Sequence, residues 1–163
     1  MKTSSMDTTL RELLDSIDPT GELWKCHQCG QCSFICPSYR NGGIRTREVM
    51  ELTLIGAIDP ADDDSIWQCT MCNSCTERCQ MGVDPATVIN ALRNLAASKG
   101  NVPDHFLQEA KLFKTTGLSF PITGLTKKMR KEMELEDLEI TDSAKDDLEK
   151  LIGATRLGDL DLE

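Results

Sequence analysis

The chain has few of the side chains that normally fill a thick hydrophobic core. Aromatic residues account for 4% of its 163 residues, and hydrophobic residues for 39%. No segment approaches the roughly 18 consecutive apolar residues of a transmembrane helix, so we expect no membrane span. Gly-x-Gly-x-x-Gly and P-loop motifs are also missing, which leaves nucleotide and flavin sites of those kinds unsupported. We expect the chain to have no small-molecule substrate of its own.

A secretory signal is not visible either, because the first four residues lead into no apolar segment. The net charge of −9 is carried by one end of the chain. Residues 132–163 contain 12 acidic and three basic side chains, whereas residues 1–131 contain 15 of each. Nucleic acid is a poor partner for so acidic a protein, because its phosphates select positive charge. We expect a cytoplasmic protein that does not bind nucleic acid.

The chain is rich in cysteine, with eight residues of this type. They form two copies of the pattern Cys-x2-Cys-x2-Cys-x3-Cys, at Cys26, Cys29, Cys32 and Cys36 and at Cys69, Cys72, Cys75 and Cys79. The copies are offset by 43 residues, and Trp24 and Trp67 each precede a first cysteine by two. Gly30 aligns with Asn73, and both residue types tolerate the left-handed backbone conformation. The pattern predicts a duplicated structural unit.

This spacing is typical of proteins that bind two [4Fe–4S] clusters, in which the fourth cysteine of each run serves the other cluster. Thiolate is also the soft ligand that iron–sulfur clusters select. We therefore predict two [4Fe–4S] clusters. One is held by Cys26, Cys29, Cys32 and Cys79, and the other by Cys69, Cys72, Cys75 and Cys36. The fourth ligands are exchanged between the two runs, which predicts a short path for electrons between the clusters.

Disulfide bonds and zinc binding are two other uses of closely spaced cysteines. Gaps of two and three residues suit convergence on a metal better than disulfide pairing across loops. Zinc sites usually take two ligands from each of two separated Cys-x2-Cys motifs, which differs from three cysteines followed by a fourth and by Pro37. A zinc-stabilised interaction module without redox function remains the alternative from another class of protein.

The remaining sequence predicts helices. A capping box at Thr9 opens an apolar stripe over residues 10–17. Between the runs, residues 47–58 carry apolar residues at helical spacing, and after the second run Asp84 predicts an N-cap with proline at the first helical position. Further helices are predicted over residues 104–114 and 126–135 and in the acidic tail after Ser143.

These elements predict an all-α fold, because a helix fills the interval between the runs where small β-hairpin ferredoxins have strands. We predict three parts: an N-terminal helix over residues 1–21, a helical two-cluster ferredoxin domain over residues 22–100, and a partner-binding helical, acidic extension over residues 101–163.

The two runs, the helix between them and the segment Cys79-Gln80-Met81-Gly82-Val83-Asp84-Pro85 resemble the C subunits of heterodisulfide reductases from methanogenic archaea. The segment over residues 39–48 is similar to that family too. The resemblance covers roughly residues 20–100 and is weaker over residues 117–130. It implies a protein without catalysis of its own, which carries electrons within an oxidoreductase complex.

The resemblance further implies the partners. In that family, the C subunit passes electrons from the flavin-containing, bifurcating A subunit to the B subunit, which reduces the disulfide between coenzyme M and coenzyme B in methanogenesis. Hydrogenase or formate dehydrogenase supplies the electrons indirectly. The alternative is an electron-transfer component of another oxidoreductase, of the 2-hydroxy-acid, succinate/fumarate or glycerol-3-phosphate type.

Overall fold

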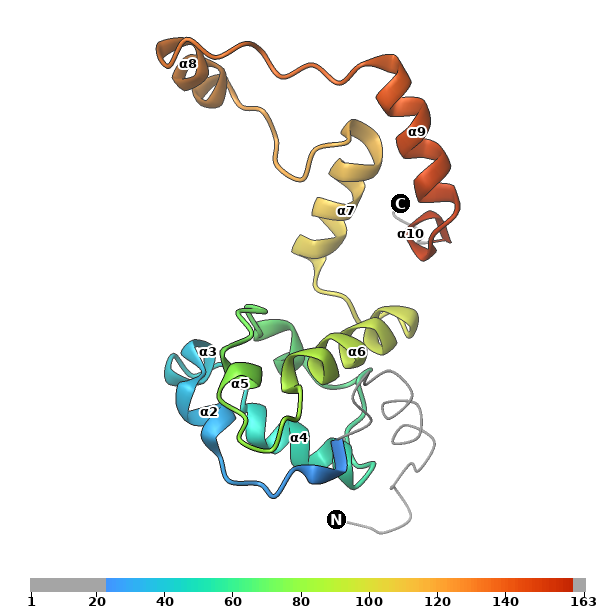
Figure 1. Cartoon of the computed structure of the whole chain (residues 1–163). Helices are drawn as coiled ribbons and strands as arrows, with labels where there is room; N and C mark the ends of the chain where they lie inside the picture. The colour runs from blue at the N-terminus through green and yellow to red at the C-terminus, as the bar shows by residue number, and fades with distance from the viewer. Residues whose placement is uncertain (1–22, 160–163) are drawn as a thin grey trace. The chain divides into compact units, whose positions relative to one another are not determined.

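A computed structural model of the chain describes residues 23–159, so the helix predicted over residues 1–21 lies outside the described residues. The chain divides into two compact units, Met1–Asn101 and Val102–Glu163. Every regular element among residues 23–159 is a helix, as Figure 1 shows for each unit. This confirms the predicted all-α fold. None of these helices is long and apolar enough to cross a membrane.

The first unit is built from short helical turns around the cysteines and from two longer helices. The longer helices are α4 (Thr46–Leu54) and α6 (Pro85–Ser98), which pack against each other. The short elements are η2 (Leu23–Lys25), α2 (Gln31–Ile35), α3 (Pro37–Arg40), η3 (Asp64–Gln68) and α5 (Ser74–Glu77). The sequence did not predict these short turns, because elements of three to five residues are too brief to show a helical period.

The predicted duplication is visible in the backbone. Gly30 caps α2 with a φ of 83°, and Asn73 caps α5 with a φ of 59°, so both residues take the left-handed conformation expected of them. Three backbone hydrogen bonds from N–H to carbonyl occur in both copies, 43 residues apart. Cys26 donates to Leu23 as Cys69 does to Ile66, Phe34 donates to Gly30 as Glu77 does to Asn73, and Cys36 donates to Ser33 as Cys79 does to Thr76. Helices α2 and α5 also pack against each other. The two cysteine runs are therefore two copies of one local fold.

The hydrophobic core of this unit lies under the cysteine loops. Its largest fully buried apolar residues come from each segment around the runs: Leu23, Ile44, Met50, Ile66, Val83, Val88, Ile89 and Leu92. The α6 contribution follows from the apolar stripe at helical spacing, which turns one face of the helix inwards. Four cysteines join this core or pack against it, namely Cys26, Cys36, Cys69 and Cys79. The core thus supports the loops that carry the thiols.

The sequence predicted the start of α6 better than the end of α4. Helix α6 begins at Pro85 behind the N-cap Asp84, as predicted, and it ends at Ser98. Helix α4 ends at Leu54, four residues before the predicted end at Ile58. Gly56 has a φ of 63° and donates its N–H to the carbonyl of Thr53, which closes the helix. Ile58 is still buried, but from the segment after the helix.

The second unit contains α7 (Asp104–Thr116), α8 (Gly124–Glu132), α9 (Asp142–Gly153) and α10 (Arg156–Asp159). The predicted helix over residues 104–114 extends to Thr116, where Gly117 closes it with a φ of 70°. Thr123 caps α8, so this helix starts two residues earlier and ends three residues earlier than predicted. The helix predicted in the acidic tail is α9, but Thr141 caps it through the N–H of Ala144, so it begins at Asp142, before Ser143.

Candidate iron–sulfur sites

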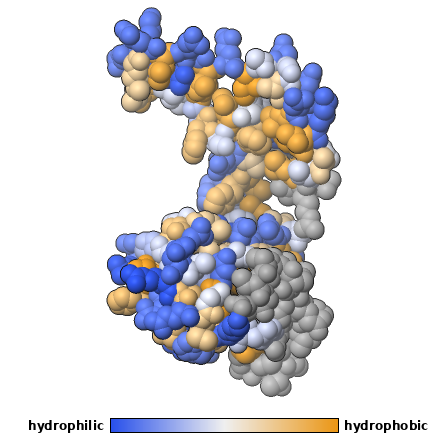
Figure 2. Space-filling view, viewed as in Figure 1, coloured by the Kyte–Doolittle hydropathy of each residue, from blue (hydrophilic) through white to orange (hydrophobic). Residues whose placement is uncertain are grey.

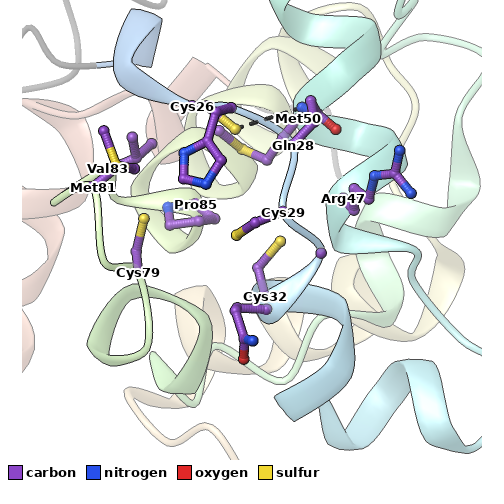
Figure 3. A pocket seen from close by; sticks show the side chains of 13 residues that line it. Cys26, Gln28, Cys29, Cys32, Arg47, Met50, Cys79, Met81, Val83 and Pro85 are labelled. Carbon is purple, nitrogen blue, oxygen red and sulfur yellow. Dashed lines mark hydrogen bonds between the residues drawn. The ribbon is translucent and has the colours of Figure 1, made fainter.

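Four cysteines from both runs line one cavity in the first unit. Cys26, Cys29 and Cys32 come from the first run, and Cys79 is the last cysteine of the second run. In Figure 3 the sulfur atoms of Cys29, Cys32 and Cys79 point into the same space. We call these four cysteines the first site. The cavity is also lined by Met50, Met81, Val83 and Pro85.

The local backbone explains how the first run presents its thiols. Gln28 and Gly30 both have positive φ, which turns the chain sharply between the cysteines before α2 begins. Arg47 donates its backbone N–H to the hydroxyl of Ser33 at 2.8 Å, which ties α4 to α2. The amide of Gln28 lies 3.5 Å from Cys26 Sγ (Figure 3). The run is thus held from outside by the backbone of Arg47, while Gln28 contacts Cys26 from within it.

The other four cysteines are Cys36, Cys69, Cys72 and Cys75, which the sequence analysis predicts as ligands of the other cluster. We call these four the second site. The charge of Cys69 adds slightly to the effect of burial in raising the pKa of Cys75. The segment after Cys36 is joined to the second run by Ser38, whose hydroxyl donates to the carbonyl of Gln68 at 2.8 Å. The same hydroxyl accepts from the N–H of Ile44. Ser38 therefore holds the end of the first run beside the start of the second.

One arginine fixes the backbone that leads into the second site. The guanidinium of Arg93, on α6, donates to the carbonyl of Ile66 at 2.9 Å, to that of Trp67 at 3.0 Å and to that of Cys69. It also lies 5.4 Å from the centre of a Trp67 ring. Burial lowers the pKa of Arg93, and the Cys69 thiolate partly offsets this effect. A side chain with five fixed donors suits this role, because it can bind several carbonyls at once.

The thiols differ in how easily they ionise. Burial raises the pKa of the Cys75 thiol to about 11, and burial also raises the pKa of Cys32. Hydrogen bonding with Ser74 lowers the pKa of Cys72, which is exposed. Iron binds the thiolate, so binding of a cluster releases the protons of the Cys32 and Cys75 thiols.

The residues present fit an iron–sulfur cluster by their chemistry. The first site offers four thiols, which is the donor set that iron–sulfide cores take. His27 also lines this cavity, but four cysteines already complete the ligand set of one cluster. Within residues 23–159, no group of three or more histidine, cysteine or acidic side chains is arranged to hold a single metal ion.

Several residues of these sites could not be singled out from the sequence. Ser38 and Arg93 act through hydrogen bonds to distant carbonyls, which no local spacing reveals. Met50 lines the first cavity from the buried face of α4, a role that its place in the sequence does not indicate. Only the three-dimensional packing shows that Met50 lines the cavity.

Comparisons with known proteins agree with the chemistry of the cysteines. Residues 22–83 match the 4Fe-4S dicluster domain family. The protein is therefore an iron–sulfur protein of the class that carries two [4Fe–4S] clusters, which confirms the predicted cofactors.

The relatives define the family more closely. The chain is 38% identical to the C2 subunit of the H2/formate:CoB-CoM heterodisulfide,ferredoxin reductase of Methanococcus maripaludis, over 79% of this chain and 71% of the relative. It is 33% identical to the iron-sulfur C subunit of the CoB–CoM heterodisulfide reductase of Methanopyrus kandleri, over 88% and 80%. It is also 34% identical to the corresponding C subunit of Methanothermobacter thermautotrophicus, over 89% and 82%. The chain belongs to the family of heterodisulfide reductase C subunits, whose members are electron-carrying components of an oxidoreductase.

Proposed function

We propose that this protein relays electrons from the flavin-containing, bifurcating A subunit to the B subunit of a heterodisulfide reductase, which reduces the disulfide of coenzyme M and coenzyme B in methanogenesis. The observation that carries the proposal is the cavity shared by Cys79 and the first run. It supports two cluster sites that exchange their fourth ligands and so lie close together. Such a pair suits a relay, because electrons then cross only a short gap inside the protein.

In this proposal the first site is formed by Cys26, Cys29, Cys32 and Cys79, and the second site by Cys69, Cys72, Cys75 and Cys36. Each bound cluster supplies a centre that accepts and returns one electron. The chain's own contribution is to hold the thiols, to exclude water and to set the charge around each site. Met50 and Val83 are 1% exposed, so they close the first cavity with apolar atoms.

Each proposed site also has a ligand at the surface. Cys29 and Cys72 are both exposed, and they occupy the same position in the two copies of the repeat. The buried ligands Cys36 and Cys75 belong to the second site. Two exposed ligands on two sites supply the two ends that a relay needs, one to receive electrons and one to deliver them.

The second unit supports binding to a partner. Large apolar side chains are exposed along α8 and the segments beside it, at Phe120, Leu125, Met129, Met133, Leu135 and Leu138. Figure 2 shows apolar surface gathered between hydrophilic side chains on this unit. Exposed apolar patches of this kind mark interaction surfaces. We propose that the extension over residues 101–163 docks onto another protein of the complex.

The test is anaerobic co-purification of the native chain from the cytoplasmic fraction, followed by electron transfer. We expect the A and B subunits to travel with the chain, and hydrogenase or formate dehydrogenase to reduce it only through the A subunit. If the chain contained eight iron and eight sulfide but bound neither protein, the proposed relay would be rejected. The assignment of two [4Fe–4S] clusters would still hold. Fractionation that finds the complex outside the cytoplasm would reject the proposed location.

A further inference from the structure

The two copies differ in the helix that follows each cysteine run. Met50, on α4, is 1% exposed and lines the first cavity with apolar atoms. Arg93, on α6, instead directs a guanidinium to the backbone that leads into the second run.

The Arg93 charge is held close to the second site. Its guanidinium donates to the carbonyl of Cys69, which is itself a ligand of that site, and to two carbonyls just before it. The side chain is partly buried, and the Trp67 ring lies against it. A charge fixed in a partly buried position is screened less than a mobile surface charge. Its field therefore acts on the second site with little loss.

The first cavity has its own arginine, Arg47, but in a different setting. Arg47 is exposed, so water and salt screen its charge. In Figure 3 its guanidinium is directed away from the sulfur atoms of Cys29 and Cys32. Within residues 23–159, the basic side chains that line the first cavity, Arg47 and His27, are both exposed, whereas Arg93 beside the second site is partly buried.

Resting on the proposed ligand sets, we propose that Arg93 tunes the relay by raising the reduction potential of the second-site cluster above that of the first-site cluster. Addition of one electron makes a cluster with its four thiolates more negative by one charge, and a nearby cation stabilises the more negative form. Nearby charge is one of the factors that set the potentials of iron–sulfur clusters. Electrons that reach the protein then settle on the second site, and they leave it for the B subunit.

The test is an EPR-monitored titration with dithionite of the full chain, loaded anaerobically. Cys29→Ser and Cys72→Ser, each at the exposed ligand of one site, assign the two signals. We expect Arg93→Gln to shift the midpoint of the second-site cluster to a lower potential and to leave the other midpoint in place. Arg93→Lys retains the charge and should restore most of the shift. Lys99→Gln, an exposed cation that follows the same helix and pairs with Asp59, should move neither midpoint.

Two results would overturn the inference. One is an unchanged second-site midpoint in Arg93→Gln with eight iron still bound. The other is an equal shift of the second-site midpoint in Arg93→Gln and Arg93→Lys, or loss of the second cluster from both variants. Arg93 would then act only by holding the loop and not through its charge. The titration uses the isolated chain, so it does not depend on binding to the A and B subunits. Failure of the relay proposal would therefore appear in the co-purification. Failure of the tuning proposal would appear in the midpoint potentials of the two clusters.

Discussion

Cys79 lies at the same cavity as Cys32, although 47 residues separate them in the chain. Cys79 is the last residue of the second run, whereas Cys32 lies within the first run. Their approach follows from the packing of α2 against α5, the helices that carry Cys32 and Cys75. The last cysteine of one copy is thereby directed into the site of the other.

The first prediction concerns this exchange of ligands. Cys36→Ala should damage the cluster whose other proposed ligands are Cys69, Cys72 and Cys75, although Cys36 itself belongs to the first run. Cys79→Ala is the matched variant and should damage the other cluster. Iron content should fall from eight to about four in each variant, with loss of one EPR signal. If Cys36→Ala removed the signal that Cys29→Ser perturbs, the crossed assignment would be wrong.

The second prediction concerns Gly43. A Cβ at this position would clash with the hydroxyl of Ser38 and lie 3.0 Å from the Ser38 carbonyl oxygen. Gly43→Ala should therefore displace the hydroxyl that joins Gln68 to Ile44, at a cost of about 1–3 kcal/mol in the free energy of unfolding. Denaturant unfolding of the loaded chain measures the loss. Gly124→Ala is the control, since a Cβ there meets nothing within 4 Å; an equal loss in both variants would contradict the role of Ser38.

The third prediction concerns the cap of α6. Asp84 accepts from the N–H of Thr87 at 3.1 Å and from the hydroxyls of Thr76 and Thr87. Burial would raise the pKa of this carboxyl, but the hydrogen bonds from Thr76 and Thr87 outweigh it and the pKa is lowered. The carboxylate thus stabilises the fold fully above its unfolded pKa of about 3.9, and this contribution is lost as the pH falls through the lower folded pKa.

At pH 7 the whole contribution is present, so Asp84→Ala should cost about 1–2 kcal/mol in the free energy of unfolding. Asp84→Asn keeps the cap and should cost less. Thr141→Ala removes the comparable cap of α9 in the other unit and should leave cluster content unchanged. Equal stability of Asp84→Ala and the wild type would refute this account of the helix start.

The fourth prediction concerns the exposed apolar residues of the extension. Phe120 is 78% exposed and Leu125 is 68% exposed. Replacing both by serine should weaken co-purification with the other proteins of the complex by tenfold or more if they are anchors of the interface, because a buried aromatic anchor is worth about 2 kcal/mol or more. Iron content should stay at eight. Lys145→Ala, an exposed residue on α9, serves as the control, and unchanged binding of the double variant would remove the extension from the interface.

The sequence was most informative where one residue type serves one purpose. Cysteine spacing predicted the two clusters, and proline after Asp84 predicted the start of α6. Periodicity was less reliable at the end of α4, because Ile58 is buried whether or not the helix continues. The signal that decides is Gly56, whose left-handed conformation closes the helix. Arg93 and Ser38 could not have been found, since their partners lie 24 to 30 residues away in the chain.

The proposed exchange of fourth cysteines has a consequence for the symmetry of the chain. With Cys79 assigned to the first site and Cys36 to the second, neither half of the repeat would hold a full ligand set alone. Two identical halves related by a twofold axis would each complete the other, as protomers do across a symmetric interface. This assignment therefore gives the chain the construction of a homodimer joined into one polypeptide. In a joined chain the two halves need not be identical, and here Met50 and Arg93 lie on the helices that follow the two runs.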